Sequence, residues 1–133
     1  MNDPAGAIAT VEKFLRLLEA RNLDEAAAYL APGVTITFPG GRRFSNLGEQ
    51  VASSAGRFRA VRKVFEKFDA VADGDQVIVY IFGTLEGEAL DGSPFSGVRF
   101  IDRFVLVAGR IIDQKVWNDM AESKVLERRD EAE

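Results

Sequence analysis

The 133-residue sequence contains neither cysteine nor histidine. Without cysteine, the chain can form no disulfide, no thiolate-ligated metal site and no cysteine nucleophile. Without histidine, a Ser-His-Asp arrangement and a histidine-ligated zinc or iron site are excluded as well. Acid–base chemistry near neutral pH would have to use carboxylates, tyrosine, lysine or bound water. Because no group of Asp and Glu residues has a metal-like spacing, we expect no metal site and no cofactor.

The sequence also lacks a basic excess and any long apolar run. Its formal net charge of −4 argues against a nucleic-acid-binding surface. No apolar run approaches membrane-spanning length, and the opening MNDPAGAIAT has no secretory-signal pattern. We therefore expect a cytoplasmic protein with no membrane or nucleic-acid partner. With 47% hydrophobic and 29% charged residues, the sequence predicts one globular domain over residues 1–133.

The first half of the sequence predicts helices. Apolar residues recur at helical spacing in the opening segment, and Asn22 or Asp24 could cap a second helix that Pro32 and Gly33 would stop. The stretch VTITF is rich in β-branched residues and precedes a Pro-Gly-Gly loop. The predicted elements are helices over residues 4–20, within 20–33 and, more weakly, within 45–58, with a short strand over 34–38.

The second half predicts antiparallel strands. Apolar and polar residues alternate in four long segments that are separated by the turn-like stretches ADGD, LDGSP and VAGR. Helices followed by such strands are typical of the α+β class. The charged residues 121–133 predict a frayed helix or a disordered C-terminal tail. The predicted strands are residues 61–72, 76–88, 95–107 and 110–120.

One predicted strand, GVRFIDRFVLV at residues 97–107, carries a carboxylate within an apolar stripe. Because side chains alternate along a strand, Asp102 shares a face with Val98, Phe100 and Phe104, while the adjacent arginines point the other way. An unpaired inward carboxylate costs on the order of several kcal/mol if it is charged. Asp102 is therefore a candidate functional residue. Alternatively, it lies near a sheet edge, or a backbone amide or buried water satisfies it.

Two longer segments carry a family resemblance. FLRLLEARNLDEAAAYLAPGVTITFPGG and DRFVLVAGRIIDQKVWND resemble the opening and closing parts of SnoaL-like proteins. These proteins belong to the superfamily of nuclear transport factor 2, ketosteroid isomerase and scytalone dehydratase. The resemblance implies a cone-shaped fold in which three N-terminal helices pack in a strongly curved antiparallel sheet around an apolar pocket. It also implies a homodimer through the outer sheet face.

The resemblance implies a role for Asp102, but the residues that other members of the superfamily use for catalysis are replaced in this sequence. In ketosteroid isomerase, the aspartate of the matching strand stays protonated and binds an oxyanion. The tyrosine and the base of that enzyme fall on Phe14 and Phe38 here. The final-strand aspartate of limonene epoxide hydrolase falls on Val116, and scytalone dehydratase relies on histidine. The chain is therefore expected to be neither a ketosteroid isomerase nor a limonene-type epoxide hydrolase.

Alternation and the expected pairing of the last two strands define a predicted pocket. Asp102 and Asn118 are its predicted catalytic residues. We read the mixed cations and aromatics of RFRAVRKVFEKF as a solvated or interfacial strand face, which leaves no second ionisable group in the pocket. The amides could also serve as local hydrogen-bonding groups and the phenylalanines as simple core. The predicted wall consists of Phe14, Leu18, Phe38, Val98, Phe100, Phe104, Gln114, Val116 and Met120.

Two functions fit these observations. The first is a cofactor-independent isomerase, cyclase, dehydratase or hydrolase that acts on a small hydrophobic molecule, with Asp102 as acid or hydrogen-bond donor. The alternative is a non-catalytic small-molecule carrier or a dimeric association module. An outward apolar stripe beside Trp117 is the predicted dimer interface, because such a patch is costly in water. The stripe consists of Ile101, Val105 and Val107, whereas the faces of Tyr80 and Phe82 cannot be assigned.

Overall fold

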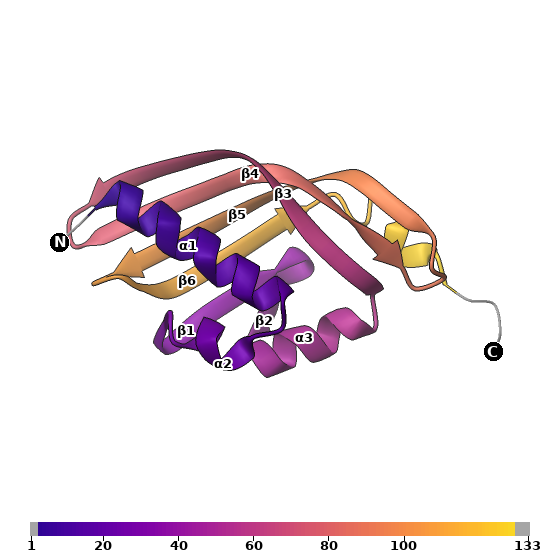
Figure 1. Cartoon of the computed structure of the whole chain (residues 1–133), viewed down its shortest axis with the longest axis horizontal. Coiled ribbons are helices and arrows are strands. Elements are labelled where there is room, and N and C mark those ends of the chain that lie inside the picture. Colours follow the sequence, from indigo (N-terminus) through magenta and orange to yellow (C-terminus); the bar gives the residue numbers. More distant parts are fainter. Residues whose placement is uncertain (1–2, 130–133) are drawn as a thin grey trace.

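Three helices lie against the concave side of one strongly curved sheet in the computed structural model, which describes residues 3–129 (Figure 1). The sheet has six strands in the order β2-β1-β6-β5-β4-β3. This is the predicted α+β, cone-shaped architecture. The strands are β1 (Leu30–Phe38), β2 (Arg42–Phe44), β3 (Phe58–Asp73), β4 (Gln76–Ala89), β5 (Pro94–Val107) and β6 (Arg110–Asn118).

The helices begin where local hydrogen bonds cap them. Helix α1 (Pro4–Glu19) starts with a proline, and the Asp3 carboxylate accepts a hydrogen bond from the backbone of Ala5 at 3.1 Å. Helix α3 (Leu47–Ala55) is capped by Asn46 in the same way. Helix α2 (Leu23–Ala27) is a single short segment. The apolar face of α1 is buried against the sheet, and its buried residues are Ala7, Val11, Phe14, Leu15, Leu17 and Leu18.

The predicted second helix was too long, and the predicted first strand too short. Helix α2 ends at Ala27, and β1 runs through the proline and glycine that were expected only to stop the helix. The Tyr29 carbonyl accepts a hydrogen bond from the Ile111 backbone at 2.8 Å, and β1 then pairs in parallel with β6. This pairing joins distant segments, so local propensity did not reveal it. A short 3-10 turn (Pro39–Gly41) leads into β2, a three-residue strand that was not predicted.

Two glycines of β4 permit the strong curvature of the sheet. A Cβ atom on Gly83 would lie 2.0 Å from the Val64 carbonyl oxygen, and one on Gly87 would lie 2.0 Å from the Ala60 carbonyl oxygen. No larger residue fits such close approaches of the neighbouring strand. Strand β3 also has a bulge between Phe65 and Lys67, which increases its bend. Together these features fold the first half of β3 over the concave face.

The C-terminal segment is better packed than predicted. Residues 121–127 form turns and a 3-10 helix (Val125–Glu127), and the Val125 side chain is buried. Arg128 donates to the Pro94 carbonyl at 3.1 Å, and its own carbonyl accepts from the Asp91 backbone. Instead of the expected frayed helix or disordered tail, residues 121–129 thus form a packed segment, and the other expected tail residues, 130–133, lie outside the described range. Within residues 3–129, no helix combines the length and apolarity needed to cross a membrane.

The outer face of the sheet is only partly apolar. Ile101 and Trp117 are direct cross-strand partners, with exposed fractions of 37% and 51%. Val105, on the same side of β5 as Ile101, is only 5% exposed. Tyr80 and Phe82, which the sequence left unassigned, pair with Arg103 and Ile101 and so lie on this outer face. The predicted stripe thus contracts to a smaller patch around Trp117.

Candidate functional site

The buried Asp102 carboxylate forms an ion pair with Lys63. Asp102 lies in β5 and is fully buried, and Lys63 reaches it from β3, two strands away. The Lys63 ammonium donates a hydrogen bond to Asp102 Oδ2 and lies 4.9 Å from the centre of the Phe100 ring. The prediction that Asp102 has no nearby cation was therefore wrong. Its partner comes from the strand that we interpreted as a solvated face.

The environment of Asp102 acts on its pKa in two opposing directions. Burial raises the pKa of the Asp102 carboxyl above its ordinary value, and the Lys63 charge and hydrogen bond oppose that rise. The second carboxyl oxygen, Oδ1, has no hydrogen-bond partner among the described residues. Among the described residues, only the Lys63 ammonium therefore offsets the cost of removing the Asp102 carboxylate from water.

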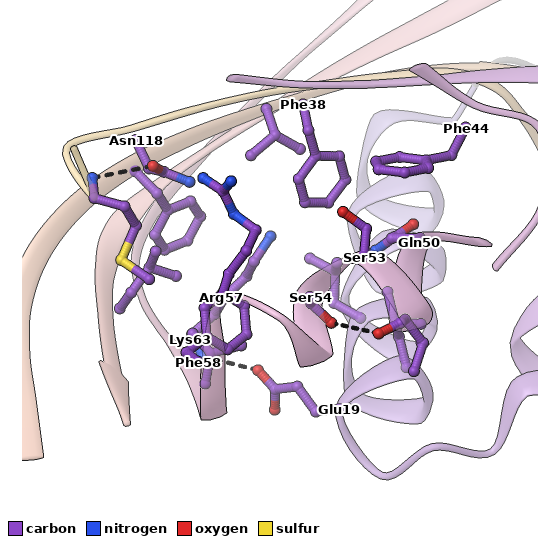
Figure 2. A pocket seen from close by; sticks show the side chains of 18 of the residues that line it. Glu19, Phe38, Phe44, Gln50, Ser53, Ser54, Arg57, Phe58, Lys63 and Asn118 are labelled. Atoms are coloured by element: carbon purple, nitrogen blue, oxygen red, sulfur yellow. Dashed lines mark hydrogen bonds between the residues drawn. The ribbon is translucent and has the colours of Figure 1, made fainter. Parts of the chain in front are cut away.

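A partly enclosed cavity of about 100 Å³ opens between the helices and the sheet (Figure 2). Its walls come from α1, α3, β1, β2 and the four long strands. Lys63 lines the cavity, whereas Asp102 lies behind it and does not. Seven predicted site residues do line it: Leu18, Phe38, Phe100, Gln114, Val116, Asn118 and Met120.

Three other predicted wall residues lie elsewhere. Phe14 and Phe104 pack edge to face in the core, with ring centres 6.0 Å apart, and neither lines the cavity. Val98 lines a separate hollow beside the end of the β4–β5 hairpin. These residues face inward as the alternation predicted. Phe14 of α1 and Phe104 of β5, however, pack against each other, so these two inward residues are core rather than cavity wall.

Three amide side chains give the cavity polar groups. Gln114 is only 1% exposed, and neither its amide oxygen nor its nitrogen has a hydrogen-bond partner within residues 3–129. The buried Gln50 oxygen is likewise unpaired. Asn118 Oδ1 accepts a hydrogen bond from the Met120 backbone at 3.1 Å, so its NH₂ group remains available to a ligand. Buried polar groups of this kind usually have hydrogen-bond partners, so these amides are suited to bind the polar groups of a ligand.

The cavity wall also contains charged residues that our sequence analysis missed. Arg21, Arg42 and Arg57 line it together with Lys63, and Glu19 is its only carboxylate among residues 3–129. Alternation in β3 does place position 63 on the same face as Val61 and Phe65, so the signal for Lys63 was present. The arginines gave no such signal, because β2 and the α3–β3 junction are too short to show a period. No group of three or more metal-ligating side chains occurs within the described residues.

Comparisons with known proteins agree with this fold. Residues 11–114 match the family model of the SnoaL-like domain. Among solved structures, an NTF2-like protein of unknown function from Burkholderia pseudomallei K96243 shares 21% identity, with a TM-score of 0.73 over 91% of this chain and 96% of that one. TerC, co-crystallised with polyporic acid, shares 18% identity, with a TM-score of 0.74 over 91% and 97%.

A third solved structure is a protein from Jannaschia sp. CCS1, provisionally described as a SnoaL-like polyketide cyclase. It shares 16% identity, with a TM-score of 0.68 over 96% of this chain and 95% of that one. Among curated protein sequences, none matches this chain significantly. The structural likenesses, all at low identity, establish the fold alone.

Proposed function

This chain belongs to the SnoaL-like domain family, and from that premise we propose that its cavity binds a small, mainly apolar carbonyl compound and isomerises it without a cofactor. The observation that carries the proposal is the Lys63 side chain, which lines the cavity and is held from behind by a fully buried carboxylate. An ionisable group at an apolar wall is the usual means of acid–base catalysis when histidine is absent.

The proposed reaction is a proton transfer through Lys63. Lys63 first transfers one ammonium proton to Asp102, and the nitrogen lone pair that this frees then removes a proton from the carbon beside the ligand carbonyl. The enolate oxygen accepts a hydrogen bond from the Asn118 NH₂ group, which stabilises the developing charge. Lys63 then returns the proton to a different carbon. One C–H bond breaks and another forms, so the step needs no oxidant and no metal.

In this proposal Lys63 and Asn118 contact the ligand, and Asp102 is a positioning residue. Its buried carboxyl orients Lys63 and accepts its proton, for which the raised pKa of Asp102 is favourable. Glu19 is a poor alternative base. One of its oxygens accepts from Arg16 and the other from the Lys63 backbone, both at 2.8 Å. The steroid isomerase mechanism remains excluded, because Phe14 and Phe38 supply neither a phenol nor a base.

The proposal can be tested by hydrogen exchange of a simple ketone. We expect the protein to accelerate exchange of the α-protons of 2-tetralone with D₂O by about 100-fold over buffer, as measured by proton NMR. Lys63→Met abolishes the acceleration, and the matched control Lys67→Met, at an exposed position of the same strand, retains it. Asp102→Asn alters the pH profile of exchange while 2-naphthol, an enol mimic, still binds. Equal exchange rates with Lys63→Met and the unmodified protein would refute the mechanism.

The carrier alternative predicts a different pair of results. A non-catalytic binding protein would bind 2-naphthol in calorimetry but would leave the exchange rate of 2-tetralone at that of buffer. The buried, unpaired amide of Gln114 supports this alternative, because it serves binding equally well without chemistry. Gln114→Leu is then expected to weaken 2-naphthol binding, since the amide is a hydrogen-bonding group of the cavity.

We also propose that the chain forms a homodimer through the outer sheet face. The support is the exposed pair of Ile101 and Trp117, two large apolar side chains side by side on neighbouring strands. A two-fold interface would bury the patch of each copy against the same patch of the other.

A further inference from the structure

Two arginines line the cavity without an acidic partner. Arg42 and Arg57 are both half-buried, and within residues 3–129 neither forms an ion pair. Their mutual proximity has an electrostatic cost: burial lowers the pKa of Arg42, and the nearby Arg57 charge lowers it further. An anion placed between two such groups would relieve that repulsion.

Arg42 is held in a fixed position rather than extended into solvent. Its Nε donates to the Pro39 carbonyl at 3.2 Å, and Nη1 donates to the Ser53 hydroxyl at 3.1 Å. Its guanidinium carbon lies 5.9 Å from the ring centres of both Phe38 and Phe44. Other N–H groups of the guanidinium fork have no partner in the part of the chain that the structure describes, and a pre-positioned fork suits an oxyanion.

The charge balance of the cavity is opposite to that of the chain. The whole sequence has a net charge of −4, yet the cavity wall contains Lys63 and three arginines against Glu19 alone. Lys63 is neutralised by Asp102, and Glu19 is bound by Arg16. Positive charge therefore remains at the cavity, in a protein with ample acidic residues that could have compensated it.

The end of α3 does not account for these cations. A helix C-terminus attracts positive charge through its unpaired carbonyl groups. Here the carbonyls of Ser53 and Ser54 accept hydrogen bonds from the backbones of Gly56 and Arg57, at 3.3 and 3.0 Å. Figure 2 shows the Arg57 side chain extending into the cavity between Asn118 and the serines of α3, rather than back along the helix.

We propose that the natural ligand carries a carboxylate, which Arg42 and Arg57 bind together while its apolar body lies in the cavity. This inference rests on the proposed function, since it names the substrate class of the same cavity. The ligand would then have two anchors: its oxyanion at the arginines of β2 and the α3–β3 junction, and its carbonyl at Lys63 and Asn118. An acidic ring compound with a keto or enol group has this arrangement of polar groups.

Calorimetric titration with two probes of the same ring system tests the proposal. The probes are 2-naphthol and 6-hydroxy-2-naphthoate, which differ by one carboxylate that is ionised at pH 7. We expect the carboxylate probe to bind about tenfold more tightly, because a charge-assisted hydrogen bond is worth about that factor. Arg57→Gln and Arg42→Gln should each abolish the difference while leaving the affinity for 2-naphthol within about twofold.

The neighbouring Arg43→Gln is the matched control, since Arg43 lies in the same strand, is exposed and does not line the cavity. It should leave the affinities of both probes unchanged. Equal affinities of the two probes for the unmodified protein would overturn the carboxylate proposal. So would an equal effect of Arg57→Gln on both probes, which indicates a structural role. Failure of 2-naphthol itself to bind would instead refute the proposed function, so the two failures are distinguishable.

Discussion

Replacing Lys63 with methionine would leave the Asp102 carboxyl buried without a partner. Asp102 is fully buried, its Oδ1 already lacks a hydrogen bond, and Lys63 is its only ion-pair partner among the described residues. A charged carboxylate in that position would carry a large desolvation cost. In Lys63→Met the group would therefore remain protonated in the folded state, while it ionises normally in the unfolded chain.

The pH sets the size of the effect. An unfolded aspartate has a pKa of about 3.9, so pH 7 lies about three units higher, and each unit is worth about 1.4 kcal/mol. Keeping the group protonated thus costs about 4 kcal/mol at pH 7. In Lys63→Met the pKa of Asp102 is higher in the folded state than in the unfolded chain. The free energy of unfolding is therefore unaffected by this group below the unfolded pKa, and it falls as the pH rises from there towards the folded pKa. The destabilisation by Lys63→Met should accordingly shrink to less than about 1 kcal/mol near pH 4.5.

Urea unfolding at several pH values between 4.5 and 8, followed by circular dichroism, measures this difference against the unmodified protein. The double variant Lys63→Met with Asp102→Asn is the matched control, because a neutral amide has no proton to gain. We expect it to be more stable than Lys63→Met at pH 7 and to show no pH dependence from this site. A pH-independent destabilisation by Lys63→Met, or a double variant no more stable than the single one, would refute the reasoning.

Three further predictions concern the sheet and its core. Gly83→Ala should destabilise the fold by about 3 kcal/mol in urea unfolding, because its Cβ would collide with a backbone carbonyl, whereas Gly56→Ala, which has ordinary contacts, should not. Trp117→Lys should convert a dimer to a monomer in light scattering, while Ala9→Lys on exposed α1 leaves the dimer intact; a dimeric Trp117→Lys would contradict the proposed interface. Phe14→Tyr should cost about 1–3 kcal/mol of stability in urea unfolding without changing 2-naphthol affinity, because the hydroxyl would be buried in the core rather than in the cavity.

A cavity with cations at one part of its wall and an ion pair at another would recognise both ends of a ligand. The apolar surface between them supplies affinity but little discrimination among ligands of similar size. Hydrogen bonds to buried polar groups supply the discrimination, because a mismatched ligand leaves those groups unpaired. For the proposed ligand, discrimination should accordingly depend on Lys63, Asn118, Arg42 and Arg57 more than on the surrounding phenylalanines.

Local periodicity was sufficient to predict most of the secondary structure. The helical spacing of the opening segment and the alternation in the second half correspond to α1 and to strands β3–β6, with ends that differ by a few residues. Such patterns depend on neighbours along the chain, so they survive without knowledge of the fold. The inward direction of Asp102 followed from the same alternation. The apolar stripe around Asp102 also predicted that its side chain is buried. The composition alone excluded catalysis by histidine.

The tertiary structure decided which inward residues form the cavity and which form the core. Phe14 and Leu18 lie on the same helix face, yet only Leu18 reaches the cavity, because Phe104 packs against the ring of Phe14. The pairing of Lys63 with Asp102 likewise spans two strand pairings, that of β3 with β4 and that of β4 with β5. Such contacts join residues that are distant in sequence. Their geometry is set by the curvature of the whole sheet, which no local pattern records.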